Sequence, residues 1–96
     1  MNKDEIITEL KNLDKEISDR YRAKVKGVFG SVIRGEEHPG SDLDVLVEFL
    51  AGATLLDFVG LGLYLEERLG VAVDIVPADT IKSELKDRIL GETVFV

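Results

Sequence analysis

Two aspartates alternate at the start of the apolar segment DLDVLVEF, which begins at Asp42. Alternate residues of a strand point to the same face and lie roughly 6.6 to 6.8 Å apart, so Asp42 and Asp44 should project together as a pair of like charges. Such a pair repels unless a cation neutralises both carboxylates. Mg²⁺ or Mn²⁺ is the natural counter-ion, because these ions prefer the oxygens of carboxylates, phosphates and water.

A third acid, Asp74, interrupts the apolar segment VAVDIV. Three such acids can hold two metal ions about 3.5 to 4 Å apart, and this arrangement stabilises the attacking and leaving oxygens during in-line displacement at phosphorus. Asp74 could also accept the proton of an attacking hydroxyl group. The three acids therefore predict a metal-dependent site for chemistry at phosphate.

A Gly-Ser pair, Gly30 and Ser31, follows the short apolar segment that ends at Phe29. If a strand ends and a helical turn begins there, free backbone N–H groups and a hydroxyl are presented to a phosphate. Glycine is suited to a place where the backbone must approach a ligand closely. Ser31 could alternatively act as the N-cap of the turn, and the two roles are compatible.

Other charged residues allow a structural role beside a functional one. Arg34 could contact the phosphates, or it could pair with Glu36, Glu37 or one of the aspartates. His38, next to a proline, is interpreted as a solvated loop residue. Three basic residues are interpreted mainly as the solvated face of the last helix, with binding of triphosphate or partner as the alternative: Lys82, Lys86 and Arg88.

The elements that must position these residues follow from the hydrophobic periodicity. In the first half we expect an amphipathic helix over 2–20, a strand over 24–29, a turn over 35–40 and a strand over 42–49. In the second half we expect a helix over 55–69, a strand over 71–76, a helix capped by Asp79 or Thr80, and an edge segment over 93–96. Thr54 and Asp57 resemble a capping box, and Gly70 is a stop signal. This order predicts a two-layer α/β domain.

Composition limits the partners. The 96 residues are expected to form one domain, 1–96, which is too small to include a second domain for another substrate. The net charge of -7 argues against a large nucleic-acid footprint but allows a nucleotide held through Mg²⁺. The chain has no cysteine and a single histidine, which excludes a zinc site built from those ligands. Without a signal peptide or an apolar run of roughly 18 residues, a cytoplasmic protein is expected.

The combination of Gly30-Ser31, the ten residues Val32 to Ser41, Asp42-Leu43-Asp44 and the later Asp74 resembles the DNA polymerase β-like nucleotidyltransferases, and among them the minimal nucleotidyltransferases (MNT) of prokaryotes. The resemblance extends over nearly the whole chain. Ile33 departs from the family pattern, in which alanine is commoner, and this difference concerns local packing.

The resemblance implies a small mixed sheet with helices packed on one face. It also implies Mg²⁺-dependent transfer of a nucleoside monophosphate, here AMP from ATP, with two metal ions held by Asp42, Asp44 and Asp74. Gly30, Ser31 and Arg34 would bind the nucleotide. Minimal members often pair with a HEPN ribonuclease toxin as its antitoxin, and characterised systems of this kind adenylylate a tyrosine of the toxin.

Two other functions stay open. The chain could be a non-catalytic antitoxin that inhibits a HEPN partner by binding alone. It could also transfer the nucleotide to a small molecule, although no second domain is present to bind one. In every case little of the chain is left to enclose an acceptor, so another protein or a second copy should complete the site.

Overall fold

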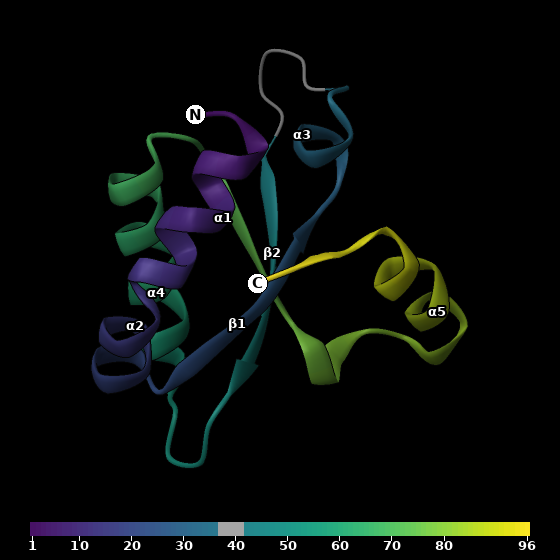
Figure 1. Cartoon of the computed structure of the whole chain (residues 1–96). Helices are drawn as coiled ribbons and strands as arrows, with labels where there is room; N and C mark the ends of the chain where they lie inside the picture. Colours follow the sequence, from purple (N-terminus) through teal and green to yellow (C-terminus); the bar gives the residue numbers. More distant parts are fainter. Residues whose placement is uncertain (37–41) are drawn as a thin grey trace.

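The computed structural model describes residues 1–36 and 42–96. The predicted loop position of His38 and most of the predicted turn lie outside the described residues. The elements, labelled in Figure 1, are α1 (Lys3–Asn12), α2 (Asp14–Tyr21), β1 (Ala23–Phe29), α3 (Ser31–Arg34), β2 (Leu43–Phe49), α4 (Leu55–Leu69), β3 (Val73–Pro77), the 3₁₀ turn η1 (Ala78–Thr80), α5 (Ser83–Glu92) and β4 (Val94–Phe95).

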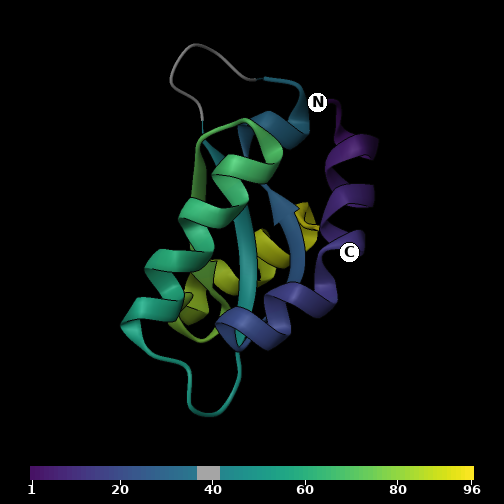
Figure 2. The ribbon, with the colours of Figure 1, turned by 90° about the vertical axis from the view of Figure 1, so that its left-hand side faces the viewer.

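The four strands form a mixed sheet in the order β3-β2-β1-β4. β2 is antiparallel to β1 and parallel to β3, and β4 is antiparallel to β1. Helices α1, α2 and α4 cover one face of this sheet (Figures 1 and 2). The predicted α/β (α+β) class with a small mixed sheet is therefore confirmed, as is the edge segment near the C-terminus.

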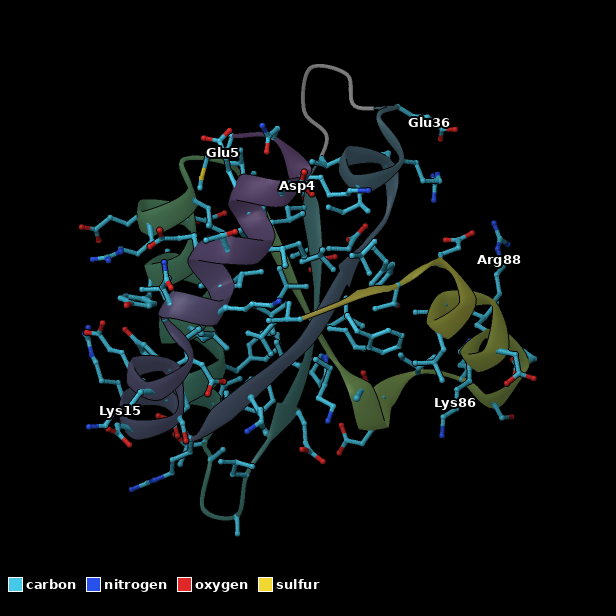
Figure 3. The ribbon with its side chains drawn as sticks, in the orientation of Figure 1. Asp4, Glu5, Lys15, Glu36, Lys86 and Arg88 are labelled. Atoms are coloured by element: carbon cyan, nitrogen blue, oxygen red, sulfur yellow. The ribbon has the colours of Figure 1, made fainter. Side chains whose placement is uncertain are left out.

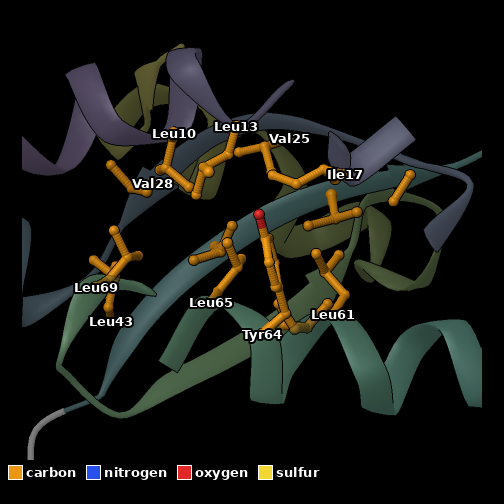
Figure 4. Packing of buried hydrophobic residues seen from close by; sticks show 14 of the residues in the cluster. Leu10, Leu13, Ile17, Val25, Val28, Leu43, Leu61, Tyr64, Leu65 and Leu69 are labelled. Carbon is orange, nitrogen blue, oxygen red and sulfur yellow. The ribbon is translucent and has the colours of Figure 1, made fainter. Parts of the chain in front are cut away.

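The hydrophobic core lies between the sheet and these three helices (Figure 4). Leu43, Val45 and Val47 are fully buried on one face of β2, as their alternation predicts. Figure 4 shows the core residues of α4 approaching from one side and those of α1, α2 and β1 from the other. The core members of α4 are Leu61, Tyr64, Leu65 and Leu69.

The N-terminal segment is two helices, and the prediction of one continuous helix over 2–20 is wrong. Leu13 separates them, with φ -89° and ψ -2°. Asn12 and Asp14 flank this break, and both residue types have low intrinsic helix propensity. The buried stripe nevertheless runs through both helices, and its members are Ile6, Leu10, Leu13 and Ile17.

Helix α4 begins and ends where the sequence predicts. Thr54 and Asp57 form a capping box, and Gly70 ends the helix in the left-handed conformation at φ 70°. Gly60 packs against Tyr21, since a Cβ added there would lie 2.9 Å from the ring. No helix in residues 1–36 and 42–96 is long and apolar enough to cross a membrane.

The last helix differs from the expectation in two ways. It begins at Ser83 instead of following an Asp79 or Thr80 cap, because residues 78–80 form a 3₁₀ turn in which the Thr80 hydroxyl donates to the Pro77 carbonyl at 2.8 Å. Helix α5 also lies on the face of the sheet opposite α1, α2 and α4 (Figures 1 and 2). None of its residues is buried, and its apolar Leu85 is 42% exposed.

Candidate active site

The pairing of β1 with β2 brings the Gly-Ser pair to the two-aspartate segment. Phe29, the last residue of β1, lies opposite Asp44 in the antiparallel register, so Gly30 follows directly beside it. Gly30 has φ 92° and ψ -171°, and a Cβ added there would lie 3.0 Å from the carboxyl carbon of Asp44. The residue is glycine for two reasons, its backbone conformation and the close approach of this carboxylate.

A single helical turn, α3, follows Gly30. Gly30 is its N-cap and Ser31 its first residue, so the alternative interpretation of Ser31 as the N-cap is wrong. The Gly30 carbonyl accepts the N–H of Arg34 at 3.1 Å. The first N–H groups of such a turn have no partner within the helix, and Ser31 adds a hydroxyl beside them. The bulkier Ile33 packs against the core.

Asp44 is the electrostatic centre of the site. Burial raises the pKa of its carboxyl above the ordinary value of 3.8, and the negative charges of Asp74 and Asp42 raise this pKa further, against a lowering contribution from Arg34. Asp74 lies directly beside Asp44 because β2 and β3 are parallel and pair these two residues. The fold therefore brings the three predicted acids into one repulsive cluster.

This cluster suits a divalent cation. Across the described residues, no three His, Cys, Asp or Glu side chains are grouped as a ready-made metal site. Mg²⁺ does not need such a group, because it usually binds one or two carboxylates and completes its shell with substrate phosphates and water. The electrostatic strain on Asp44 is the observation that fits a cation, since a positive charge there would relieve it.

A cavity of about 410 Å³ lies next to these residues. Gly30, Ser31, Arg34 and Asp44 line it from the sheet and α3. The opposite wall comes from α5, through Leu85, Arg88, Ile89 and Glu92. The cavity thus unites four of the six predicted site residues, while Asp42 and Asp74 are exposed beside Asp44 and do not line it.

Arg34 makes the structural pair predicted as one of its alternatives. Its Nε donates to Glu36 at 2.9 Å, and its Nη1 donates to Glu92 of α5 at 3.3 Å. Arg88 approaches the same Glu92 carboxylate at 3.6 Å. The pair between Arg34 and Glu92 connects α3 to α5, and Arg34 is still close enough to Asp44 to affect its pKa.

Sequence reasoning missed the contribution of α5 to the cavity. The sequence predicts Arg88 mainly as a solvated residue and gives Glu92 no role, yet both line the cavity. Arg88 and Lys86 extend from α5 in opposite directions (Figure 3), so only one of these two basic residues faces the site. No spacing signal marks Glu92, because its role depends on α5 crossing to the other face of the sheet.

Comparisons with known proteins give one consistent result. The model of a family described as "Nucleotidyltransferase domain" matches residues 7–96. Protein adenylyltransferase MntA of Thermococcus cleftensis is 43% identical over 82 residues, which cover 85% of this chain and 83% of that protein. A Methanocaldococcus jannaschii protein, provisionally named a protein adenylyltransferase, is 44% identical over 90 residues, which cover 94% of this chain and 97% of that protein.

Solved structures confirm the fold. One, provisionally described as a minimal nucleotidyltransferase, has a TM-score of 0.78 at 39% identity and covers 98% of this chain and 95% of its own. A second, described as a toxin-antitoxin crystal structure with AMP-PNP, has a TM-score of 0.66 at 20% identity. The match covers 88% of this chain and 70% of the chain in that structure. The second likeness concerns the fold alone.

Proposed function

Because the chain belongs to the nucleotidyltransferase domain family, we propose that it transfers AMP from ATP to a hydroxyl group of a partner protein, with residues 1–96 acting as one catalytic domain. The observation that carries this proposal is the position of Asp44, which lies against Gly30 with Asp74 beside it in register. The relatives named as protein adenylyltransferases support both the AMP group and a protein acceptor.

The side chains have separate roles in this proposal. Asp42, Asp44 and Asp74 would hold two Mg²⁺ ions, or Mn²⁺, whose charge stabilises the phosphate oxygens. The N–H groups that follow Gly30 and the hydroxyl of Ser31 would bind the triphosphate.

Arg34 would orient the nucleotide from α3, because it lines the cavity beside Asp44. Its guanidinium donates to both Glu36 and Glu92, and these two bonds place it at the cavity. In this position the guanidinium can contact a phosphate oxygen without leaving the Glu36 carboxylate, since it has several N–H donors.

The reaction is a displacement at the α-phosphorus of ATP. The acceptor hydroxyl oxygen forms a bond to this phosphorus, and the bond to the bridging oxygen of the β-phosphate breaks, so that pyrophosphate leaves. Asp74 accepts the proton of the hydroxyl group, because it is solvent-exposed at the edge of the site, where an acceptor can enter.

The proposed partner is a HEPN ribonuclease toxin that carries the acceptor tyrosine. Two observations support a protein partner of this kind. The cavity is open and bounded on one side by an exposed helix, so the chain does not enclose an acceptor by itself. The net charge of -7 also favours docking on a basic, RNA-binding surface. The toxin-antitoxin description of one structural neighbour is in keeping with such a partner.

The test uses the partner encoded by the adjacent gene, incubated with this protein, ATP and Mg²⁺, followed by intact mass spectrometry. Wild type should add the mass of AMP to the partner, and Asp44→Asn should not. Asp19→Asn, a matched change at an exposed position of α2, should behave as wild type. Full transfer by Asp44→Asn would refute the assignment. A stable complex that never gains mass would instead indicate the non-catalytic antitoxin.

A further inference from the structure

Helix α4 is apolar on its outer side as well as on its buried side. Four residues of this outer side are strongly exposed: Leu55 at 77%, Leu56 at 83%, Val59 at 50% and Leu63 at 64%. At 3.6 residues per turn they fall within about a third of the helix circumference. We call these four residues the α4 face. Figure 2 shows α4 along the outside of the molecule, and no other part of the described chain covers its outer side.

The α4 face extends to the edge strand that carries Asp74. A groove of about 260 Å³ runs between α4 and the edge strand β3, and its lining includes Val59, Leu63 and Asp74. Asp74 is the residue paired in register with Asp44. A protein that covers the α4 face and reaches round the edge of β3 therefore comes next to the acidic cluster on the other face of the sheet.

The charges around the α4 face select among possible occupants. Glu67 at the end of α4 and Asp74 on β3 are both exposed. In a symmetric dimer the same patch meets itself, so a second copy would place two acidic borders close together. The net charge of -7 adds to that repulsion. A different protein, with an apolar centre and basic residues around it, complements the α4 face.

We propose that the α4 face and its groove are the docking surface for the acceptor protein, and that this protein presents an apolar patch with a basic rim. The proposal rests on the proposed function, because it assigns the acceptor to the Asp74 side of the acidic cluster. The nucleotide would then occupy the cavity under α5, on the Gly30 side of Asp44. The two substrates would approach from different sides, as an in-line displacement requires.

The test compares Leu56→Gln/Leu63→Gln with Phe95→Gln. Glutamine preserves helix propensity, and both leucines are exposed, so the double variant should fold normally. Phe95 is 57% exposed on the distant strand β4 and controls for the loss of an exposed apolar side chain. Titration calorimetry with the protein of the adjacent gene, without ATP, measures docking. A thermal-shift titration of the chain alone with Mg²⁺ and ATP measures nucleotide binding.

The double variant should bind the partner roughly tenfold or more weakly, since it removes exposed apolar contacts at the centre of the docking surface. Its response to Mg²⁺ and ATP should equal that of wild type, and Phe95→Gln should retain both activities. Glu67→Lys should also weaken the complex, and higher salt should weaken it for wild type.

Three results would overturn the docking proposal. The double variant could bind the partner as wild type does, or wild type could fail to bind it at all. Sedimentation could also show that the chain alone is a dimer which the double variant dissociates, and the α4 face would then contact a second copy. The proposed function fails separately. If Asp44→Asn still transfers AMP while the double variant loses the complex, the catalytic assignment is wrong and the docking surface stands.

Discussion

Replacing Gly30 with alanine should remove activity through a specific local clash. Gly30 has φ 92° and ψ -171°, a backbone region that is essentially restricted to glycine, and occupying it with another residue costs of order 1–3 kcal/mol. The added methyl group would also lie 3.0 Å from the carboxyl carbon of Asp44 and closer still to its oxygen. The carboxylate must then move, and the proposed metal-binding position moves with it.

Gly35 is the matched control. It also has positive φ, at 76° with ψ 17°, but nothing lies within 4 Å of a Cβ added there. Gly35→Ala should therefore lower stability by about 1–2 kcal/mol through the backbone alone. For a domain of this size, each kcal/mol lowers Tm by about 4–8 °C, so both alanine variants should melt earlier than wild type.

The decisive comparison is AMP transfer, measured by intact mass at a temperature where both variants are folded by circular dichroism. Gly35→Ala should transfer AMP at close to the wild-type rate, while Gly30→Ala should transfer little or none. If Gly30→Ala is folded and as active as wild type, the contact between Gly30 and Asp44 does not position the carboxylate. An equal loss in both variants would point to general destabilisation instead.

Two further predictions concern stability. Gly62→Ala should stabilise the protein by about 1 kcal/mol through helix propensity, because the new methyl group meets only Ile75 at 3.6 Å. Gly60→Ala should gain nothing, because its methyl group would lie 2.9 Å from the Tyr21 ring. Urea denaturation measures the free energy of unfolding of both variants, and equal gains would contradict the packing. Asp44→Asn should be more stable than wild type at neutral pH in the presence of a chelator, because the raised pKa means that folding disfavours the ionised carboxyl. Protonation of the Asp44 carboxyl removes this cost, so the wild-type protein has its full stability below the unfolded pKa of about 3.8 and loses part of it as pH rises through the raised pKa. In thermal melts across pH, the advantage of Asp44→Asn should therefore vanish below pH 3.8. A variant less stable than wild type at pH 7 would contradict this sign.

Local sequence signals were sufficient for much of the fold. The alternation along β2 separates Leu43, Val45 and Val47 from the acid on the other face, and the structure buries those three residues fully. The Thr54 cap and Gly70 stop likewise give the bounds of α4, since capping depends on residues within one turn. Such features are local, so a single sequence contains the information that decides them.

The features that the sequence did not reveal depend on contacts between distant segments. The pair between Arg34 and Glu92 joins residues far apart in the chain, and it exists only because α5 crosses to the second face of the sheet. The contact of Gly30 with Asp44 depends in turn on the register of β1 and β2, which includes an irregularity between Val25 and Gly27. Periodicity fixes which face a residue occupies, but it does not fix register.

The structure of β2 explains how a small domain can include a repulsive acidic cluster. One face of this strand supplies fully buried side chains to the core, and Asp44 lies on the other face. Because side chains alternate strictly, the apolar packing that stabilises the strand is separated from the acids by the thickness of the sheet. Changes at Asp44 should therefore alter chemistry while the fold persists, whereas Val45→Ala, at a fully buried position, should destabilise the domain and affect activity only through unfolding. The site can be strained for function because three fully buried residues that hold the strand in place, Leu43, Val45 and Val47, are on the opposite face.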